Sequence, residues 1–158
     1  MIGDTFDELT GSEYHRTVHG IEKGIAPRIR IDEEVANAKT ILNLLDNDAD
    51  KNITAIHDVS AGGLAVALSE MVISSDMGCE VELTSEELDE NQLLYSESHG
   101  RYLVTVRADA VDDILSKIDV PAEVIGEVKG DILKINENEF TIDELDNSYH
   151  GVIEKYMA

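Results

Sequence analysis

Residues 53–72 read Ile-Thr-Ala-Ile-His-Asp-Val-Ser-Ala-Gly-Gly-Leu-Ala-Val-Ala-Leu-Ser-Glu-Met-Val, and the pattern of side chains changes part-way along this stretch. Residues 53–56 are rich in β-branched side chains, which is typical of a short buried strand. From Leu64 onward the apolar residues recur at helical spacing, which predicts an amphipathic helix over about 61–75. Small residues separate the two patterns and predict a tight turn. We therefore expect a buried strand that turns directly into a helix.

The chain beyond this stretch continues to alternate between strand and helix patterns. Gly78 ends the predicted helix, and the next elements are strands over 79–83 and 101–107, a helix over 111–118 and a strand over 122–128. Residues 53–129 therefore contain, in order, strand, helix, strand, strand, helix and strand. This is the order of a ferredoxin-like βαββαβ unit. The sequence predicts an α+β domain with a ferredoxin-like core.

Further elements flank this core. Apolar spacing predicts a helix over about 32–46 and a C-terminal helix from about Leu145, and residues 132–135 have the pattern of a strand. These elements would cover sheet surface that the core alone leaves exposed.

Residues 1–30 differ from the rest of the chain. Glycines divide them into short polar stretches, and at most a brief helix fits near 12–19. The whole length of 158 residues suits one domain. We expect a single domain over residues 1–158, made of an irregular N-terminal segment over 1–30 and a compact core over 31–158.

The charge of the chain excludes two classes of partner. It contains 12 Lys and Arg residues against 34 Asp and Glu residues, which gives a formal net charge of −22. Such a surface repels the phosphates of nucleic acids and of anionic lipids, so we expect neither nucleic acid nor membrane as a partner. No signal peptide is visible, and the single cysteine, Cys79, cannot form an internal disulfide. We therefore expect a cytoplasmic location.

A first group of candidate site residues lies where the predicted strand turns into the helix. His57, Asp58 and Ser60 are followed by Gly62 and Gly63, and small residues let a ligand approach the backbone closely. Unpaired N–H groups and the helix dipole at such a turn favour an anion such as phosphate, and Asp58 adds a candidate Mg²⁺ ligand. In the alternative interpretation, Ser60 or Asp58 caps the helix and the two glycines allow close packing.

A second group precedes the predicted strand over 101–107. Ser96, Glu97, Ser98 and Arg101 concentrate hydroxyl, carboxylate and guanidinium groups that can hold phosphate or sugar hydroxyls. The alternative is a solvated turn in which Arg101 forms a surface ion pair. We assign no catalytic residue, because the sequence shows neither a serine or cysteine triad nor a Walker-type phosphate loop.

Several short motifs occur in a specific order along the chain. They are Gly3-Asp4-Thr5, Gly11-Ser12-Glu13-Tyr14, His57-Asp58-Val59-Ser60, Gly62-Gly63-Leu64, Ser96-Glu97-Ser98, Gly100-Arg101 and Val124-Ile125-Gly126-Glu127-Val128. Over nearly the whole chain they closely resemble the AIR synthase-related protein C-terminal domain family, and within it the last domain of phosphoribosylformylglycinamidine synthase subunit II. Related domains in AIR synthetase, selenophosphate synthetase, thiamine-monophosphate kinase and a hydrogenase maturation protein remain alternatives.

The resemblance implies a three-layer α/β/α domain and a role in de novo purine biosynthesis. The synthase that the chain resembles is a ligase that uses ATP and Mg²⁺. It converts formylglycinamide ribonucleotide and ammonia from glutamine into formylglycinamidine ribonucleotide. Its catalytic histidine and most ATP contacts belong to N-terminal-type domains that this sequence does not show, so the isolated chain is expected to be inactive. The implied partners are those domains, a glutaminase subunit and a small accessory subunit.

The resemblance also implies what the two groups of site residues bind. They would belong to a pseudo-symmetric nucleotide or phosphate site made of His57, Asp58, Ser60, Gly62, Gly63, Ser96, Glu97, Ser98 and Arg101, with Asp58 as the Mg²⁺ ligand. Ala61 departs from the family pattern, which commonly has an aspartate there. A second hypothesis is a non-catalytic domain with a vestigial nucleotide site that supports and docks other subunits. An apolar sheet face left uncovered in the isolated chain would also predict a homodimer.

Overall fold

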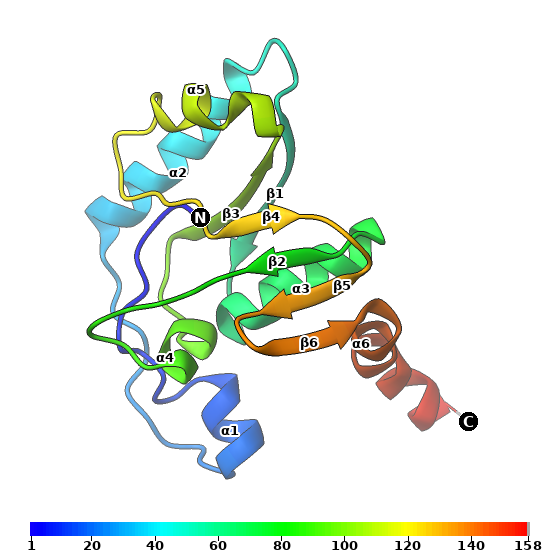
Figure 1. Ribbon diagram of the computed structural model, residues 1–158. Coiled ribbons are helices and arrows are strands. Elements are labelled where there is room, and N and C mark those ends of the chain that lie inside the picture. Colours follow the sequence, from blue (N-terminus) through cyan, green and yellow to red (C-terminus); the bar gives the residue numbers. More distant parts are fainter. Residues whose placement is uncertain (158) are drawn as a thin grey trace. The chain divides into compact units, whose positions relative to one another are not determined.

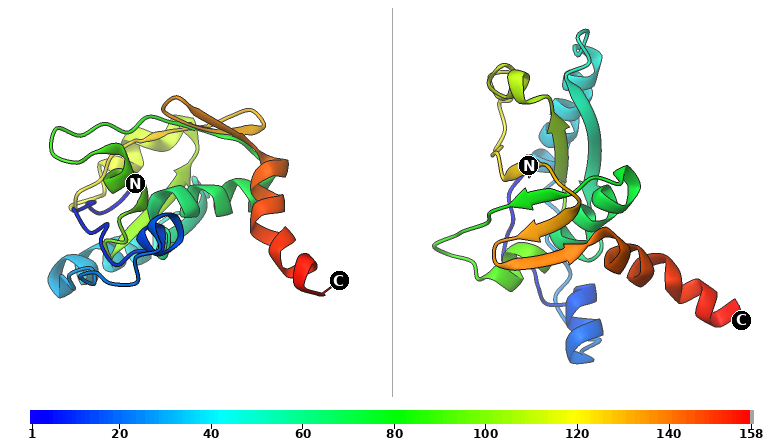
Figure 2. Two further views of the ribbon diagram at one scale, coloured as in Figure 1. Left: turned by 90° about the horizontal axis from the view of Figure 1, so that it is seen from below. Right: turned by 45° about the vertical axis from the view of Figure 1, so that its right-hand side comes forward.

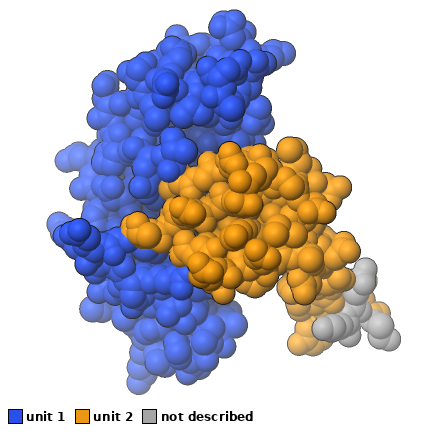
Figure 3. Space-filling model, in the orientation of Figure 1, with its two compact units in different colours: residues 1–67, 85–124 blue, residues 68–84, 125–158 orange. Residues whose placement is uncertain are grey.

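The structure, a computed structural model, describes residues 1–157, and over residues 153–155 it describes the backbone alone. By its internal contacts the chain divides into two compact units, which Figure 3 colours separately. Unit 1 contains residues 1–67 and 85–124, and unit 2 contains residues 68–84 and the chain from Ile125 onward. Each unit is therefore built from two separate stretches of sequence.

Unit 1 contains a two-stranded antiparallel sheet and most of the helices (Figure 1). Its elements are α1 (Glu13–His19), α2 (Ile31–Asp46), β1 (Ile53–Val59), the start of α3 (Gly63–Ser75), α4 (Glu90–Tyr95), β3 (Arg101–Val106), the 3₁₀ turn η1 (Ala108–Ala110) and α5 (Val111–Leu115). In the β1–β3 pair, His57 lies opposite Leu103 and Val59 lies opposite Arg101. This register places the end of β1 beside the start of β3, where the two groups of candidate residues meet.

The core of unit 1 forms where α2 and α5 pack on the β1–β3 pair. Ile41 and Leu44 from α2 are buried together with Ile114 from α5. The backbone of Ile2 joins this core, because its N–H donates to the Tyr102 carbonyl at 2.8 Å and its carbonyl accepts from the Tyr102 N–H at 2.9 Å. The start of the N-terminal segment is therefore an integral part of unit 1.

Unit 2 contains a four-stranded mixed sheet. Its elements are the end of α3, β2 (Cys79–Val81), β4 (Gly126–Val128), β5 (Ile132–Ile135), β6 (Asn138–Thr141) and α6 (Ile142–Met157). The strand order is β4-β2-β5-β6, with β2 parallel to β5 and the other neighbours antiparallel. Figure 2 shows α6 continuing directly from β6. No helix of the described residues is long and apolar enough to cross a membrane.

The α+β class and most predicted elements are confirmed, but the pairing of the strands differs from a ferredoxin-like sheet. β2 bonds to β4 on one edge and to β5 on the other, so neither edge is open to β3. In the described residues β1 and β3 therefore form a sheet of their own. The strand predicted over 53–56 continues to Val59, which places His57 and Asp58 within β1 rather than in the turn.

Two elements of the structure were not predicted. α4 lies between the strands predicted over 79–83 and 101–107, and it begins with a capping box in which Asp89 and Gln92 each bond to the other's backbone N–H. β6 forms a hairpin with β5 around Asn136, whose φ of +52° lies in the left-handed region. Both elements depend on local turn chemistry more than on apolar periodicity.

Candidate functional site

The turn from β1 into α3 positions the first group of candidate residues. The Gly63 N–H donates to the Ser60 carbonyl at 3.0 Å. Gly62 and Gly63 have φ values of +80° and +69°, which glycine adopts without strain. A Cβ on Gly63 would lie only 2.7 Å from the Leu94 carbonyl oxygen and 2.8 Å from the Ser96 carbonyl oxygen. These contacts support the packing interpretation of the glycine pair, with residues 94–96 as the segment packed against it.

Ser96 and Ser98, from the second group, hold the N-terminal segment. Both side chains are completely buried. The Ser98 hydroxyl accepts a hydrogen bond from the Phe6 N–H at 3.0 Å, and the Ser96 hydroxyl accepts one from the Glu8 N–H at 3.3 Å. The two hydroxyls therefore bond to the backbone of the chain itself.

Arg101 completes this anchor from the start of β3. Its Nε donates to the Ser98 carbonyl at 2.9 Å, and its Nη2 donates to the Ser96 carbonyl at 2.5 Å. Its Nη1 donates to the Thr5 hydroxyl at 2.9 Å. Burial lowers the pKa of Arg101 to about 10, while the charges of Glu8 and Glu97 act in the opposite direction. The guanidinium is therefore charged at neutral pH, and its hydrogen bonds order the loop in place of a ligand.

Glu8 and Arg30 fix the later part of the N-terminal segment. Glu8 Oε1 accepts from Arg30 Nη2 at 2.9 Å and from the Arg28 N–H at 2.8 Å, and the Arg30 guanidinium lies 3.6 Å from the centre of the Phe6 ring. Burial acts to raise the pKa of Glu8. Hydrogen bonds from Arg30, Ser98 and the Arg28 backbone outweigh this, so the pKa lies below its usual value. Our sequence analysis did not identify this pair, since no local pattern connects its members.

Glu97, from the second group, bonds to the starts of two helices. Its Oε1 accepts from the Gly62 N–H and from the Glu13 N–H, each at 2.8 Å. Glu13 is the first residue of α1, and Gly62 immediately precedes α3. A carboxylate thus already satisfies one of the N–H groups at the start of α3.

A pocket of about 420 Å³ lies at this turn in unit 1. It is lined by Pro27, Glu34, Asp58, Val59, Ser60, Ala61, Glu97, His99, Gly100, Arg101 and Tyr102. Of the predicted site residues, the structure brings together Asp58, Ser60, Glu97 and Arg101. The others, which are His57, Gly62, Gly63, Ser96 and Ser98, are not part of the lining.

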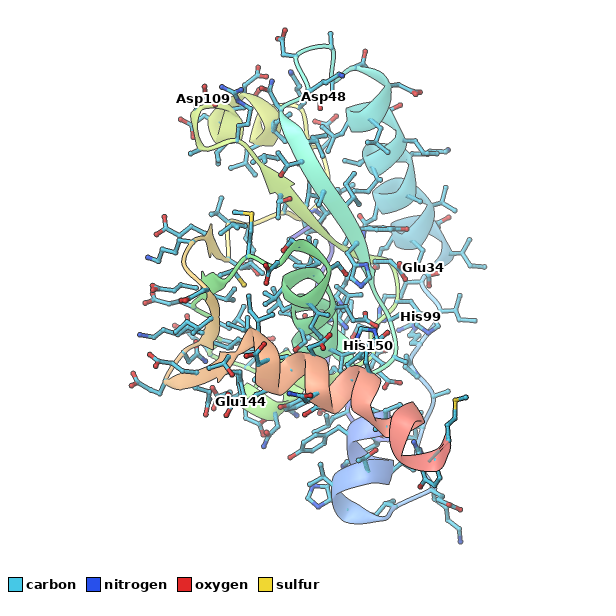
Figure 4. All side chains as sticks on the ribbon, turned by 90° about the vertical axis from the view of Figure 1, so that its right-hand side faces the viewer. Glu34, Asp48, His99, Asp109, Glu144 and His150 are labelled. Carbon is cyan, nitrogen blue, oxygen red and sulfur yellow. The ribbon has the colours of Figure 1, made fainter. Side chains whose placement is uncertain are left out.

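The charged side chains of the pocket lining are mainly acidic. It contains the carboxylates of Glu34, Asp58 and Glu97. His99 lies beside Glu34 in Figure 4, with Nδ1 3.7 Å from Glu34 Oε1, and the donors of Arg101 are bonded within the loop. Such a lining favours a cation or a metal-bound phosphate over a free anion. The sequence did not identify Glu34 as a candidate, because it comes from the first turn of α2, far along the chain from the other acidic residues of the lining.

The protein side chains of the lining do not by themselves form an Mg²⁺ site. Among the described residues, no group of three His, Cys, Asp or Glu side chains could hold a metal ion. Glu34 already accepts from the Arg30 N–H, and Glu97 accepts from two backbone N–H groups. Mg²⁺ commonly takes one or two carboxylates together with substrate phosphates, and Asp58 is positioned to be such a carboxylate.

Comparison with known proteins identifies the family. The family model of the AIR synthase related protein, C-terminal domain, matches residues 1–135. The chain belongs to this family. The AIR synthase-related fold class that we expected is thereby confirmed, and the matched range includes every lining residue of the pocket.

Relatives of this AIR synthase-related domain are long proteins. The phosphoribosylformylglycinamidine synthase subunit PurL of Methanobrevibacter smithii is 70% identical over 162 aligned residues, which cover 100% of this chain and 23% of that protein. The corresponding subunit of Methanothermobacter thermautotrophicus is 44% identical, with coverage of 100% and 22%. The chain therefore spans less than a quarter of the length of these relatives.

Solved structures share the fold of the AIR synthase-related domain at low sequence identity. PurL of Thermotoga maritima complexed with FGAR superposes with a TM-score of 0.73 at 18% identity, covering 91% of this chain and 26% of that one. The hydrogenase maturation protein HypE superposes with a TM-score of 0.58 at 18% identity, covering 89% and 50%. These likenesses concern the fold alone.

Proposed function

We propose that this chain is the AIR synthase-type C-terminal domain of a phosphoribosylformylglycinamidine synthase. In this proposal the complete enzyme uses ATP to join ammonia from glutamine to formylglycinamide ribonucleotide in purine biosynthesis. The observation that carries the proposal is the 70% identity to the PurL subunit of Methanobrevibacter smithii along the whole chain. Identity at this level favours the synthase over the sibling enzymes that have related domains.

The geometry supports different roles for this domain and for the rest of that enzyme. This domain contributes the acidic pocket beside Asp58, and the parts of the enzyme outside it contribute the catalytic groups. A nucleotide whose phosphates carry Mg²⁺ suits the pocket, because Asp58 can complete the metal shell. Solved PurL structures contain ATP and, separately, FGAR, and another is described as PurLQS. We accordingly propose a glutaminase subunit and a small accessory subunit as partners, and the cytoplasm as the location.

A chimeric enzyme tests this proposal. The segment of Methanobrevibacter smithii PurL that matches this chain is replaced by residues 1–158. Phosphate release is then measured with formylglycinamide ribonucleotide, Mg-ATP and ammonium. We expect activity close to that of the native enzyme, and none from the isolated chain.

The controls separate a folding failure from a functional one. The same enzyme lacking the segment should be inactive, and circular dichroism should show that the chimera is folded. A folded but inactive chimera, or phosphate release by the isolated chain, would contradict the proposal.

A second candidate function is a non-catalytic domain with a vestigial nucleotide site. It is favoured by the bonds of Ser96, Ser98 and Arg101 to the chain's own backbone, which leave fewer groups for a ligand. Calorimetry with Mg-ADP on the chimera distinguishes the two candidates. If the pocket binds nucleotide, Asp58→Ala abolishes one binding event and the exposed control Asp50→Ala does not. Equal binding by all variants would favour the non-catalytic domain.

A further inference from the structure

One side of α2 presents apolar side chains that the fold of unit 1 leaves exposed. The core side of the helix buries Ile41 and Leu44. A second set of apolar residues follows the heptad spacing of a coiled-coil seam, with intervals of four, three, four and three residues. Its large members are 45% to 68% exposed, and the alanine between them is half-buried. This set, the α2 seam, consists of Ile31, Val35, Ala38, Leu42 and Leu45.

The α2 seam lies in a part of the chain where positive and negative charges nearly balance. Residues 16–45 contain five Lys and Arg residues and four Asp and Glu residues, which gives a net charge of +1. The rest of the chain therefore has a net charge of −23, because the whole chain has −22. A second copy of the chain is repelled least where it approaches the nearly neutral stretch. A strongly acidic or basic partner would find little net charge there to attract it.

Two oppositely charged residues flank the α2 seam on the same edge, one heptad apart. Asp32 follows Ile31 and Lys39 follows Ala38, and both charged side chains are exposed. Among the described residues, neither Asp32 nor Lys39 takes part in an ion pair. In an antiparallel pair of helices, residues at this heptad position face the same position of the partner helix. One register sets Ile31 of one copy against Leu42 of the other. In this register Lys39 of each copy lies beside Asp32 of the other, so the same ion pair forms twice.

We propose that the α2 seam is a dimerisation surface that binds a second copy of this chain. The two α2 helices lie antiparallel across a two-fold axis, so the contacts occur in symmetric pairs. The apolar residues of the seam supply the buried surface, and the two pairs of Lys39 with Asp32 select the antiparallel register. A contact between two such short seams buries less than the roughly 800 Å² per partner of a standard interface, so we expect a weak dimer.

Sedimentation equilibrium of the 158-residue chain over a concentration series tests the dimer. At about 0.15 M NaCl, repulsion between charges more than about 8 Å apart is screened, while ion pairs in direct contact are weakened less. The wild type should dimerise. Val35→Ser removes an apolar side chain from the seam and should weaken the dimer about ten-fold. Val124→Ser is the matched control, because Val124 is 61% exposed in the same unit and lies outside α2. Its dimer should be as tight as that of the wild type.

Exchange of the two charges tests the register. Lys39→Glu sets a carboxylate against Asp32 of the other copy, and Asp32→Lys sets an ammonium group against Lys39. Each variant alone should therefore dimerise about ten-fold more weakly than the wild type. A mixture of the two variants restores both ion pairs, so its heterodimer should be as tight as the wild-type dimer. Lys117→Glu is the charge control, since Lys117 is exposed in the same unit and lies outside α2. This control should dimerise nearly as tightly as the wild type.

Three results would overturn the proposal. A wild-type chain that stays monomeric over the whole series would mean that the seam has a different occupant, such as another part of the complete enzyme. Equal affinities for Val35→Ser and Val124→Ser would place the contact outside the seam. A mixture of the charge variants that associates no more tightly than either one would exclude the antiparallel register. Circular dichroism shows whether each variant is folded. None of these measurements uses enzyme activity, so failure of the dimer is distinguishable from failure of the proposed function.

Discussion

Arg101 brings a charge into the interior of unit 1, where only 1% of the residue is exposed. The charge is tolerated because the guanidinium donates to two buried carbonyls and a hydroxyl. Unlike a surface ion pair, this arrangement leaves polar groups without partners if the side chain is removed. Arg101 therefore stabilises the fold by ordering the loop over residues 96–101.

Arg101→Met should destabilise the chain by about 3 kcal/mol, because the Ser96 and Ser98 carbonyls lose their donors in a buried environment. Urea unfolding followed by circular dichroism measures the change in the free energy of unfolding. Arg107→Met is the control, since Arg107 is exposed and pairs with Asp109, which is also exposed. A midpoint for Arg101→Met equal to that of the control would show that the loop does not depend on the guanidinium.

Glu8 makes part of the stability dependent on pH. Its pKa in the folded chain lies below the usual glutamate value, so its contribution is complete above that usual value and is lost as the pH falls through the folded pKa. The free energies of unfolding of the wild type and of Glu8→Gln, measured with urea, should therefore differ at pH 6 and differ less at pH 3. The comparison cancels the effect of the other acids, which titrate in both proteins. A difference that stays constant between the two pH values would mean that the Glu8 charge contributes nothing.

For single residues, the sequence predicted which side chains are chemically unusual better than it predicted which groups they contact. The group Ser96, Glu97, Ser98 and Arg101 was identified as chemically unusual. The partners of these side chains, such as Phe6 and Glu13, come from a segment that is distant along the chain. Only tertiary packing brings them together, so no local spacing could distinguish a ligand site from an internal anchor.

Among the elements, the turn before α3 limits the size of the side chain that can stand at Gly63. Gly63→Ala should cost roughly 3 kcal/mol, because it combines a positive φ with a close approach to the carbonyls of Leu94 and Ser96. Gly20→Ala is a matched control in the same unit, with a φ of +65° and no atom within 4 Å of the added Cβ. It should cost only about 1 kcal/mol. Differential scanning calorimetry of both variants measures the difference, and equal costs would mean that residues 94–96 move aside easily.

Elements with clear periodicity were predicted well, and the short strand β5 was also predicted, but β6 and α4 were not. α2 and α3 have apolar residues at helical spacing over three or more turns, so their positions were confirmed within a few residues. β6 has only four residues, all exposed, and it exists because it pairs with β5. α4 did show a sequence signal, since Asp89 and Gln92 have the spacing of a capping box. A search for caps as well as periodicity would have found it.

For the whole molecule, the net charge of −22 opposes the association that exposed apolar residues favour. In unit 1 the exposed fractions reach 81% for Ile25, 64% for Ile29 and 60% for Leu42. Because salt screens repulsion between like charges, sedimentation velocity should show a monomer at low salt and a concentration-dependent dimer at about 0.5 M NaCl. The double variant Ile25→Ser with Leu42→Ser should remain monomeric in both conditions. Dimers that form equally in low salt, or in the double variant, would contradict this prediction.

The interleaving of the two units along the sequence has a consequence for the order of folding. β1 pairs with β3 across more than forty intervening residues, and the N-terminal segment bonds to the loop over 96–101. Closing such long loops is costly and slows folding. During synthesis residues 1–84 therefore emerge before β3, Arg101 and α5, and until these follow the buried face of α2 stays uncovered. Neither unit has its full set of residues until translation has passed residue 124, so we expect this stretch of the nascent chain to remain unfolded and to depend on chaperones until then.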